Sequence, residues 1–209
     1  MKRSNRYIVE TLFEILGTVA IAALLLTSEA IWQPKPAVSS NEAASETSVP
    51  LRGDGWQELE NLGAGFAVAM PPGTVREGIE PVETSLGDLD VYVLGMDLDD
   101  RAFAVMVADF PDFFAAVPPS TLFEGAIEGV VTNVNQRLTP DRRIFLSGHP
   151  GMEMFYEGDD GLVYRHRLYL VDRRLYQLMA VIPLDISEAE RNEFFDDARP
   201  FFDSFELLD

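Results

Sequence analysis

Residues 163–182, VYRHRLYLVDRRLYQLMAVI, constrain the fold of this chain more than any other stretch. Two runs rich in Val, Leu, Ile and Tyr flank a polar break at Asp172 and Arg173. Residues of these types suit a pleated, half-buried surface, so the stretch predicts two strands, 163–171 and 175–182, joined by a tight turn. Successive side chains of a strand point to opposite faces, and both faces here carry apolar residues. We therefore expect a sheet that is covered on both sides.

The length of the turn decides which side chains share a face, because a shift of one residue moves every side chain to the other side of the sheet. A three-residue loop, 172–174, would place Leu178 on the face of Leu168, whereas a two-residue loop would place Met179 there. Asp172 suits a turn, but Arg173 should resist a positive φ. The sequence favours the three-residue loop, with the two-residue loop as the alternative.

The first 30 residues predict a segment that meets a membrane. A basic head, MKRSNR, precedes an apolar run over residues 15–26, and small residues follow at Ser28 and Ala30, a pattern typical of a secretory signal peptide. The alternative is an uncleaved anchor over about residues 7–26, with Glu10 and Glu14 facing a neighbouring helix. The apolar side chains of that anchor would be Ile15, Leu16, Val19, Ile21, Leu24, Leu25 and Leu26. Both interpretations place the rest of the chain outside the cytoplasmic membrane, in a periplasmic, lumenal or secreted location.

Composition divides the remainder into a tether and one domain. Residues 31–55 are rich in Pro, Ser, Ala and Glu without periodicity, which predicts a flexible linker, and folding should begin near Trp56. With 35 acidic and 16 basic residues the formal net charge is −19, which argues against nucleic acid or an anionic lipid surface as partner. Cysteine is absent, so disulfides and thiolate chemistry are excluded.

The pattern over residues 56–209 predicts an α+β domain, in which helices flank a mostly antiparallel sheet. The expected strands are 65–70, 82–86, 90–97, 101–110, 142–147, 152–156, 163–171 and 175–182, with a turn at 148–151. A helix over about 121–138 should begin after Ser120. A second helix should begin after Ser187, whose spacing to Glu190 predicts a capping box, and Pro200 should kink or divide it.

Several strings resemble the PsbP-like family, whose fold is an antiparallel sheet between helices. The strings are Gly65 to Pro71, Gly148-His149-Pro150-Gly151-Met152-Glu153, Arg167 to Val171 with Leu175 to Leu178, and Asp203-Ser204-Phe205. The resemblance covers about residues 56–208 and implies an α/β/α sandwich. The family includes extrinsic subunits that help to retain ions at the photosynthetic oxygen-evolving site. No metal-site or docking residue of the family matches a position here, so none of that activity is carried over.

Six arginines form the only basic concentration in the predicted domain: Arg142, Arg143, Arg165, Arg167, Arg173 and Arg174. Arg165 and Arg167 share one face of a strand. The plain interpretation is ion pairing with the many carboxylates. The sharper hypothesis makes Arg165 and Arg167 a binding face for a small anionic ligand or for an acidic segment of a partner.

The other candidates for chemistry favour structural interpretations. His166 lies between Tyr164 and Leu168 in the predicted strand and should be a hydrogen-bonded core residue, and His149 should be a turn residue without a chemical role. The spacing of these two histidines does not suit a catalytic zinc site. The acidic groups Asp97/Asp99/Asp100, Asp159/Asp160 and Asp196/Asp197 lack the spacing of a calcium loop and predict solvated turns or helix faces.

These observations predict a binding or accessory domain without enzymatic activity or cofactor, exported or tethered at a membrane, where it could serve as an auxiliary subunit of a membrane protein complex. The alternative is a small-ligand-binding protein or a hydrolase that uses carboxylates. A deep pocket with convergent polar groups would favour the alternative, and a grooved or arginine-lined patch would favour the binding domain.

Overall fold

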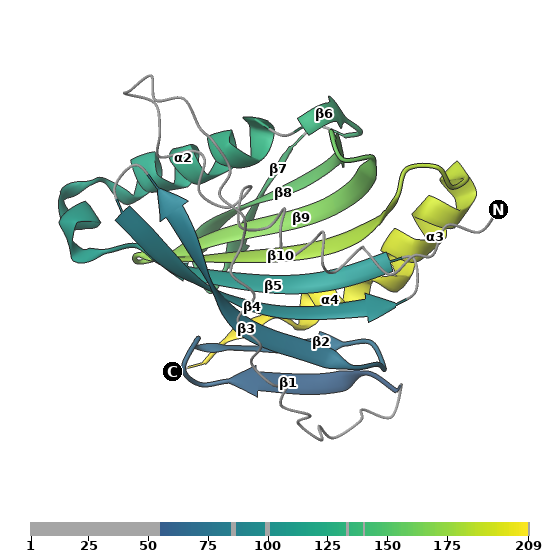
Figure 1. Ribbon diagram of the computed structural model, residues 1–209, viewed down its shortest axis with the longest axis horizontal. Helices are drawn as coiled ribbons and strands as arrows, with labels where there is room; N and C mark the ends of the chain where they lie inside the picture. Colours follow the sequence, from purple (N-terminus) through teal and green to yellow (C-terminus); the bar gives the residue numbers. More distant parts are fainter. Residues whose placement is uncertain (1–54, 85–86, 99–100, 133, 140, 209) are drawn as a thin grey trace.

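The computed structural model of the protein describes residues 55–84, 87–98, 101–132, 134–139 and 141–208, and two antiparallel sheets organise this part of the chain (Figure 1). The large sheet contains β3 (Val75–Thr84), β4 (Gly87–Leu98), β5 (Arg101–Asp109), β10 (Arg174–Pro183), β9 (Leu162–Val171), β8 (His149–Gly158) and β6 (Val134–Arg137) in that spatial order, and β7 (Arg142–Leu146) also pairs with β8. The small sheet contains β1 (Gln57–Asn61), β2 (Phe66–Met70) and β11 (Glu206–Leu207). The predicted hairpin, β9–β10, lies at the centre of the large sheet.

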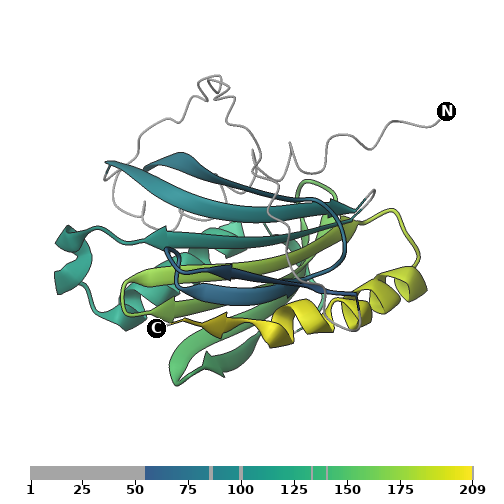
Figure 2. The ribbon, with the colours of Figure 1, turned by 90° about the horizontal axis from the view of Figure 1, so that it is seen from below.

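Helices cover both faces of the large sheet. The short helix η2 (Asp112–Ala116) and α2 (Pro119–Thr132) lie over one face. On the other face, α3 (Glu188–Asp197) and α4 (Arg199–Ser204) lie beside the small sheet (Figure 2). The predicted class, a mostly antiparallel sheet flanked by helices, is confirmed for this part of the chain. The signal or anchor segment lies outside the described residues, as does all but the last residue of the tether.

Two apolar cores form because both faces of the central strands are apolar, as the sequence predicted. Leu168 and Met179 are buried on the face under α2. Leu178 is fully buried on the opposite face, where Phe66 of β2 and Phe201 of α4 pack. Burying a side chain of this size contributes on the order of 1.5–3 kcal/mol, so the two faces together hold the layers in place.

The favoured three-residue loop of the central hairpin is wrong. Arg174 pairs with Val171 and Met179 pairs with His166, so only Asp172 and Arg173 form the turn. Asp172 takes the positive φ, 54°, and Arg173 does not. The expectation that Arg173 would resist a positive φ therefore does not exclude the two-residue loop, because Asp172 is the residue in the left-handed conformation.

The first predicted helix is wrong at both ends. The observed helix, α2, begins at Pro119, one residue before the predicted cap Ser120. Proline is suited to the first helical position, because the backbone N–H that it lacks has no helical partner there. The helix ends at Thr132 rather than near Leu138, because residues 134–137 form β6 and pair with β8. Pairing with β8 therefore outweighs the helical spacing of Val134 and Leu138.

The turn predicted at 148–151 lies earlier, at Ser147 and Gly148, which both take positive φ, 50° and 88°. His149 therefore begins β8 rather than forming the turn. Gly151 then lies inside the strand opposite Tyr169, whose ring covers the space that a side chain would fill.

The C-terminal helices agree with the sequence. The Ser187 side chain accepts from the backbone N–H of Glu190, and the Glu190 carboxylate accepts from the backbone N–H of Ser187, which completes the predicted capping box. Pro200 lies at the start of α4, so the predicted division is confirmed as a break between α3 and α4. Four phenylalanines of these helices, Phe194, Phe195, Phe201 and Phe202, are buried against the large sheet.

Candidate functional site

Strand register gathers a cluster of arginines around one carboxylate. Glu153 of β8 lies directly opposite Arg142 of β7 on one side and Arg167 of β9 on the other. Its Oε2 accepts from Arg142 Nη2 at 2.5 Å, and its Oε1 accepts from Arg167 Nε at 2.8 Å. Arg165, two residues along β9, donates from Nη2 to the same Oε1 at 3.0 Å. Cross-strand neighbours of this kind are within reach of long side chains, so three guanidinium groups share Glu153.

Arg165 and Arg167 also hold the C-terminal helices. Arg165 Nη1 donates to the carbonyl of Phe195 in the last turn of α3 at 3.2 Å, and Arg167 Nη1 donates to the carbonyl of Phe202 in α4 at 2.8 Å. Both guanidinium groups lie over the ring of Phe202, with Cζ 4.8 Å and 5.1 Å from its centroid. The last carbonyls of a helix lack helical partners, so these arginines satisfy them and fix the helices on the sheet.

The pKa of Glu153 shows which charges dominate this cluster. Burial raises the pKa of Glu153, but hydrogen bonds and positive charge from Arg167 and Arg165 outweigh burial and lower the pKa to about 2. The carboxylate therefore stays ionised at physiological pH. It orients the arginines rather than exchanging protons.

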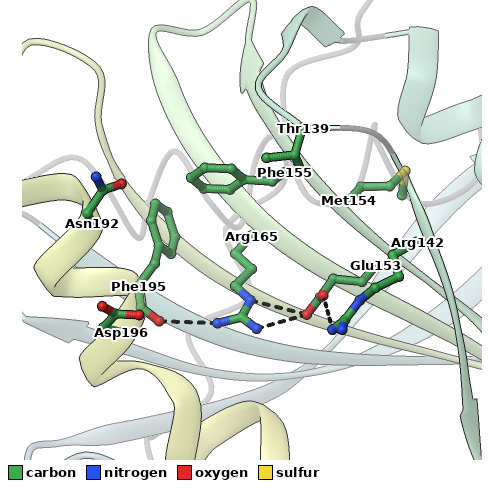
Figure 3. Close-up of a pocket in the computed structure, with 9 residues that line it drawn as sticks. All are labelled: Thr139, Arg142, Glu153, Met154, Phe155, Arg165, Asn192, Phe195 and Asp196. Carbon is green, nitrogen blue, oxygen red and sulfur yellow. Dashed lines mark hydrogen bonds and ion pairs between the residues drawn. The ribbon is translucent and has the colours of Figure 1, made fainter. Parts of the chain in front are cut away.

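An open cavity of about 460 Å³ lies between α3 and this cluster (Figure 3). It is lined by Thr139, Arg142, Glu153, Met154, Phe155, Arg165, Asn192, Phe195 and Asp196. The rings of Phe155 and Phe195 meet edge to face, 4.8 Å apart, and give the cavity an apolar wall beside its charged one. The cavity can therefore take a group that is anionic at one end and apolar at the other.

The predicted binding pair divides between two positions. Arg165 lines the cavity, while Arg167 lies behind it, bonded to Glu153, Phe202 and Asp203. Two of the other arginines lie away from the cavity: Arg173 pairs with Asp112 at 2.7 Å and Arg174 with Asp109 at 2.6 Å. Ion pairing, the plain interpretation, thus describes five of the six arginines, since Arg142, Arg165 and Arg167 pair as well.

Sequence reasoning missed the carboxylate and the helix side of the cavity. Glu153 belongs to one of the strings that resemble the PsbP-like family, but no role was predicted for it. A single acidic residue in a strand among Met and Phe is nevertheless a usable signal for a paired charge. Asn192 and Phe195 reach the cavity only because α3 folds back across β8 and β9. Nothing local in the sequence marks that contact.

His166 lies in the core under α2, outside the cavity. It is fully buried, its Nε2–H donates to Gln177 Oε1 at 3.1 Å, and its Nδ1 accepts from the hydroxyl of Tyr156 at 3.2 Å. The prediction of a hydrogen-bonded core histidine is confirmed. Burial lowers the pKa of His166 to about 3, so the ring is neutral in the folded protein.

This burial predicts acid sensitivity with a defined sign. The unfolded chain binds a proton at His166 near its ordinary pKa, 6.5, whereas the folded chain does not until about 3. The stabilisation is therefore present above pH 6.5 and lost as the pH falls below it, by about 1.4 kcal/mol per pH unit. Between pH 6.5 and 4.5 the free energy of unfolding should fall by about 2.5 kcal/mol, as measured by urea titration.

The matched variants for this measurement are His166→Gln and His149→Gln. His166→Gln should lose most of the pH dependence in that interval, and His149→Gln, which removes the other histidine at the start of β8, should keep it. An equal slope in His166→Gln and in the unsubstituted protein would contradict the assignment.

The acidic groups named from the sequence serve local structure where they are described. Asp160 accepts from the backbone N–H of Leu162 and from the hydroxyl of Tyr164, and Asp196 pairs with Arg199 at 2.8 Å. Asp99 and Asp100 lie outside the described residues. Within the described ranges, no group of three or more histidine, aspartate or glutamate side chains is arranged to hold a metal ion.

The predicted anchor side chains, Ile15, Leu16, Val19, Ile21, Leu24, Leu25 and Leu26, lie outside the described residues. Among the helices that the structure does describe, none combines the length and apolar character needed to cross a bilayer.

Comparisons with known proteins give likenesses of fold. No family model matches the sequence, and no curated protein matches it. Among solved structures, cyanobacterial PsbP (CyanoP) from Synechocystis sp. PCC 6803 has a TM-score of 0.44 and 13% identity, over 84% of this chain and 100% of its own. LpqN, involved in cell envelope biogenesis of Mycobacterium tuberculosis, has a TM-score of 0.37 and 13% identity, over 82% and 89%.

A protein of unknown function from Pseudomonas aeruginosa, PA94, described as a putative regulator, has a TM-score of 0.37 and 9% identity, over 58% of this chain and 94% of its own. Identities this low concern the fold alone, so no activity is transferred from any of the three. Cyanobacterial PsbP is thus one of the solved structures to which this chain is similar, at a TM-score of 0.44.

Proposed function

We propose that this protein is a non-enzymatic binding domain held outside the cytoplasmic membrane, where it acts as an accessory subunit of a membrane protein complex. The export or anchoring rests on the basic head, the apolar run and the small residues of the first 30 positions. The binding site is the cavity between α3 and β8. It receives an anionic group of the partner, with Arg142 and Arg165 as its cationic side chains.

One observation carries this proposal: in a chain whose net charge is −19, the cavity balances its two carboxylates, Glu153 and Asp196, with two guanidinium groups beside an apolar wall. Arg142 keeps 63% of its side chain exposed although it pairs with Glu153, so it can contact a ligand without leaving the fold. A guanidinium group carries five N–H donors, so Arg142 and Arg165 keep donors for a second anion beyond the bonds of both to Glu153 and of Arg165 to the carbonyl of Phe195.

The same geometry weakens the alternative of a hydrolase that uses carboxylates. A general base works best with a pKa near the operating pH, and the pKa of Glu153, about 2, lies far below it. The described lining includes no histidine, serine, lysine or tyrosine; its one hydroxyl belongs to Thr139, and its second carboxylate, Asp196, pairs with Arg199 at 2.8 Å. A cavity of this kind favours binding an anion over transferring a proton.

Inorganic phosphate tests the cavity directly. Full-length protein should melt at a higher temperature in phosphate than in chloride of equal ionic strength, because a ligand that binds only the folded state stabilises it. At about ten times the dissociation constant the gain is about 1.4 kcal/mol, or roughly 3–5 °C.

Arg142→Gln should abolish that shift while leaving the melting temperature in chloride nearly unchanged, because its side chain is largely exposed. Arg143→Gln, the exposed neighbour on the other face of β7, is the matched control and should keep the shift. A phosphate effect that is absent, or that both variants retain, would overturn the proposal.

A further inference from the structure

The outer edge of β7 is free within the described part of the chain. Arg142–Leu146 pairs with β8 alone, and no strand lies against its other side. The backbone N–H and C=O groups along such an edge form a template onto which another extended segment can pair. Natural sheets usually protect an edge of this kind with charge, proline or a covering element.

β7 carries two exposed charges, Arg142 and Arg143, but it also exposes an aromatic ring. Phe145 is 73% exposed, and Phe145 and Arg143 point to the face opposite Arg142. An aromatic ring held in water on an unpaired strand favours association, since aromatic residues and arginine are enriched where proteins bind one another. Arg142, on the other face of the same strand, points into the cavity (Figure 3).

The opposite edge of the large sheet gives the contrast. β3 carries Pro81, which cannot donate a backbone hydrogen bond, and the acidic residues Glu77 and Glu80. Proline and charged side chains are devices that limit pairing at an edge. β7 has no proline and its charges are basic, so in a chain of net charge −19 its two neighbouring arginines form a basic edge. Charge complementarity therefore selects an acidic partner for β7.

We propose that β7 is a docking strand to which an extended acidic segment of the partner protein adds as a further strand of the large sheet. Alternate side chains of the added strand face the side of Arg142, so a carboxylate opposite Arg142 enters the cavity. The intervening apolar side chains face Phe145 and Arg143. This inference rests on the proposed function, because it supplies the anionic group that the cavity receives, and it adds the form of the segment that carries it.

A fluorescein-labelled peptide of alternating glutamate and valine is a suitable probe, read by fluorescence anisotropy with the full-length protein. We expect saturable binding that weakens with added salt, and no binding of the matched peptide of alternating lysine and valine. Phe145→Thr should weaken the binding about tenfold, as removal of one well-placed aromatic contact does. Ile79→Thr is the matched control, because Ile79 is similarly exposed, 65%, but lies on the β3 edge.

The variants separate this inference from the proposed function. Phe145→Thr should leave the phosphate-dependent stabilisation intact, whereas Arg142→Gln should weaken both phosphate and peptide binding. Peptide binding that is unchanged in Phe145→Thr, or that Ile79→Thr weakens equally, would overturn the proposal that β7 is a docking strand. The phosphate result would still decide separately whether the cavity binds an anion. Dimerisation that depends on Phe145 without peptide binding would instead assign the edge to a second copy of the chain and would also overturn the inference.

Discussion

Replacing Glu153 by glutamine should lower the free energy of unfolding by about 3 kcal/mol, the largest loss expected from a change of one charge in this domain. Only 13% of its side chain is exposed, and Arg165 and Arg167, which share its carboxylate, are 19% and 10% exposed. Removing the acid takes the shared carboxylate from both guanidinium groups in a partly buried setting, and leaves Arg167 with the more exposed Asp203, 3.1 Å away. Chemical denaturation at neutral pH measures the loss.

The matched control is Asp109→Asn. Asp109 accepts two hydrogen bonds from Arg174, at 2.6 Å and 2.8 Å, but its side chain is 64% exposed. Screening by water should hold the effect of this change below about 1 kcal/mol. Equal losses from Glu153→Gln and Asp109→Asn would show that burial adds nothing to the cluster and would contradict its role in holding α3 and α4.

Replacing Gly151 by alanine should cost about 2–3 kcal/mol through overpacking. A Cβ at this position would lie 2.5 Å from Cδ1 of Tyr169 and 2.7 Å from the carbonyl oxygen of Leu168. The ring can turn, but the carbonyl belongs to the paired strand β9 and cannot move without breaking the ladder. Thermal or chemical unfolding measures the change.

Gly78→Ala provides the control on another strand of the same sheet. A Cβ at Gly78 meets nothing within 4 Å, so this change should alter stability by less than about 0.5 kcal/mol. A loss of that small size for Gly151→Ala would mean that β8 and β9 can separate locally, against the close packing described here.

Local chemistry predicted those elements whose signals lie within a few residues of one another. The capping box of Ser187 and Glu190 and the break at Pro200 depend on neighbours along the chain, and both are confirmed. The alternation of residues 163–182 likewise predicted a sheet with two apolar faces, because every register of that hairpin leaves apolar side chains on both sides.

Elements whose structure depends on residues far away in the sequence could not be predicted from local patterns. Val134 and Leu138 continue the spacing of a helix, yet residues 134–137 form a strand that pairs with β8. The loop at Asp172 depended on one backbone conformation that aspartate and the flanking ladder supply together.

The candidate site was predicted in part. The sequence indicated Arg165 and Arg167 as a shared face, because residues two apart in a strand point the same way. It could not show that Glu153 lies opposite Arg167, since that follows from the register of β8 against β9. The cavity itself requires α3 to lie beside Arg165, and the hydrogen bond from Arg165 to the carbonyl of Phe195 spans 30 residues of sequence.

Whether the cavity holds an anion can be decided by following the arginine side-chain Nε–H resonances of the full-length protein during a phosphate titration. We expect saturable shifts for Arg142 and Arg165, and much smaller changes for Arg173 and Arg174, which pair with Asp112 and Asp109 away from the cavity. Shifts of equal size at all four arginines, or none at Arg142 and Arg165, would contradict the proposal.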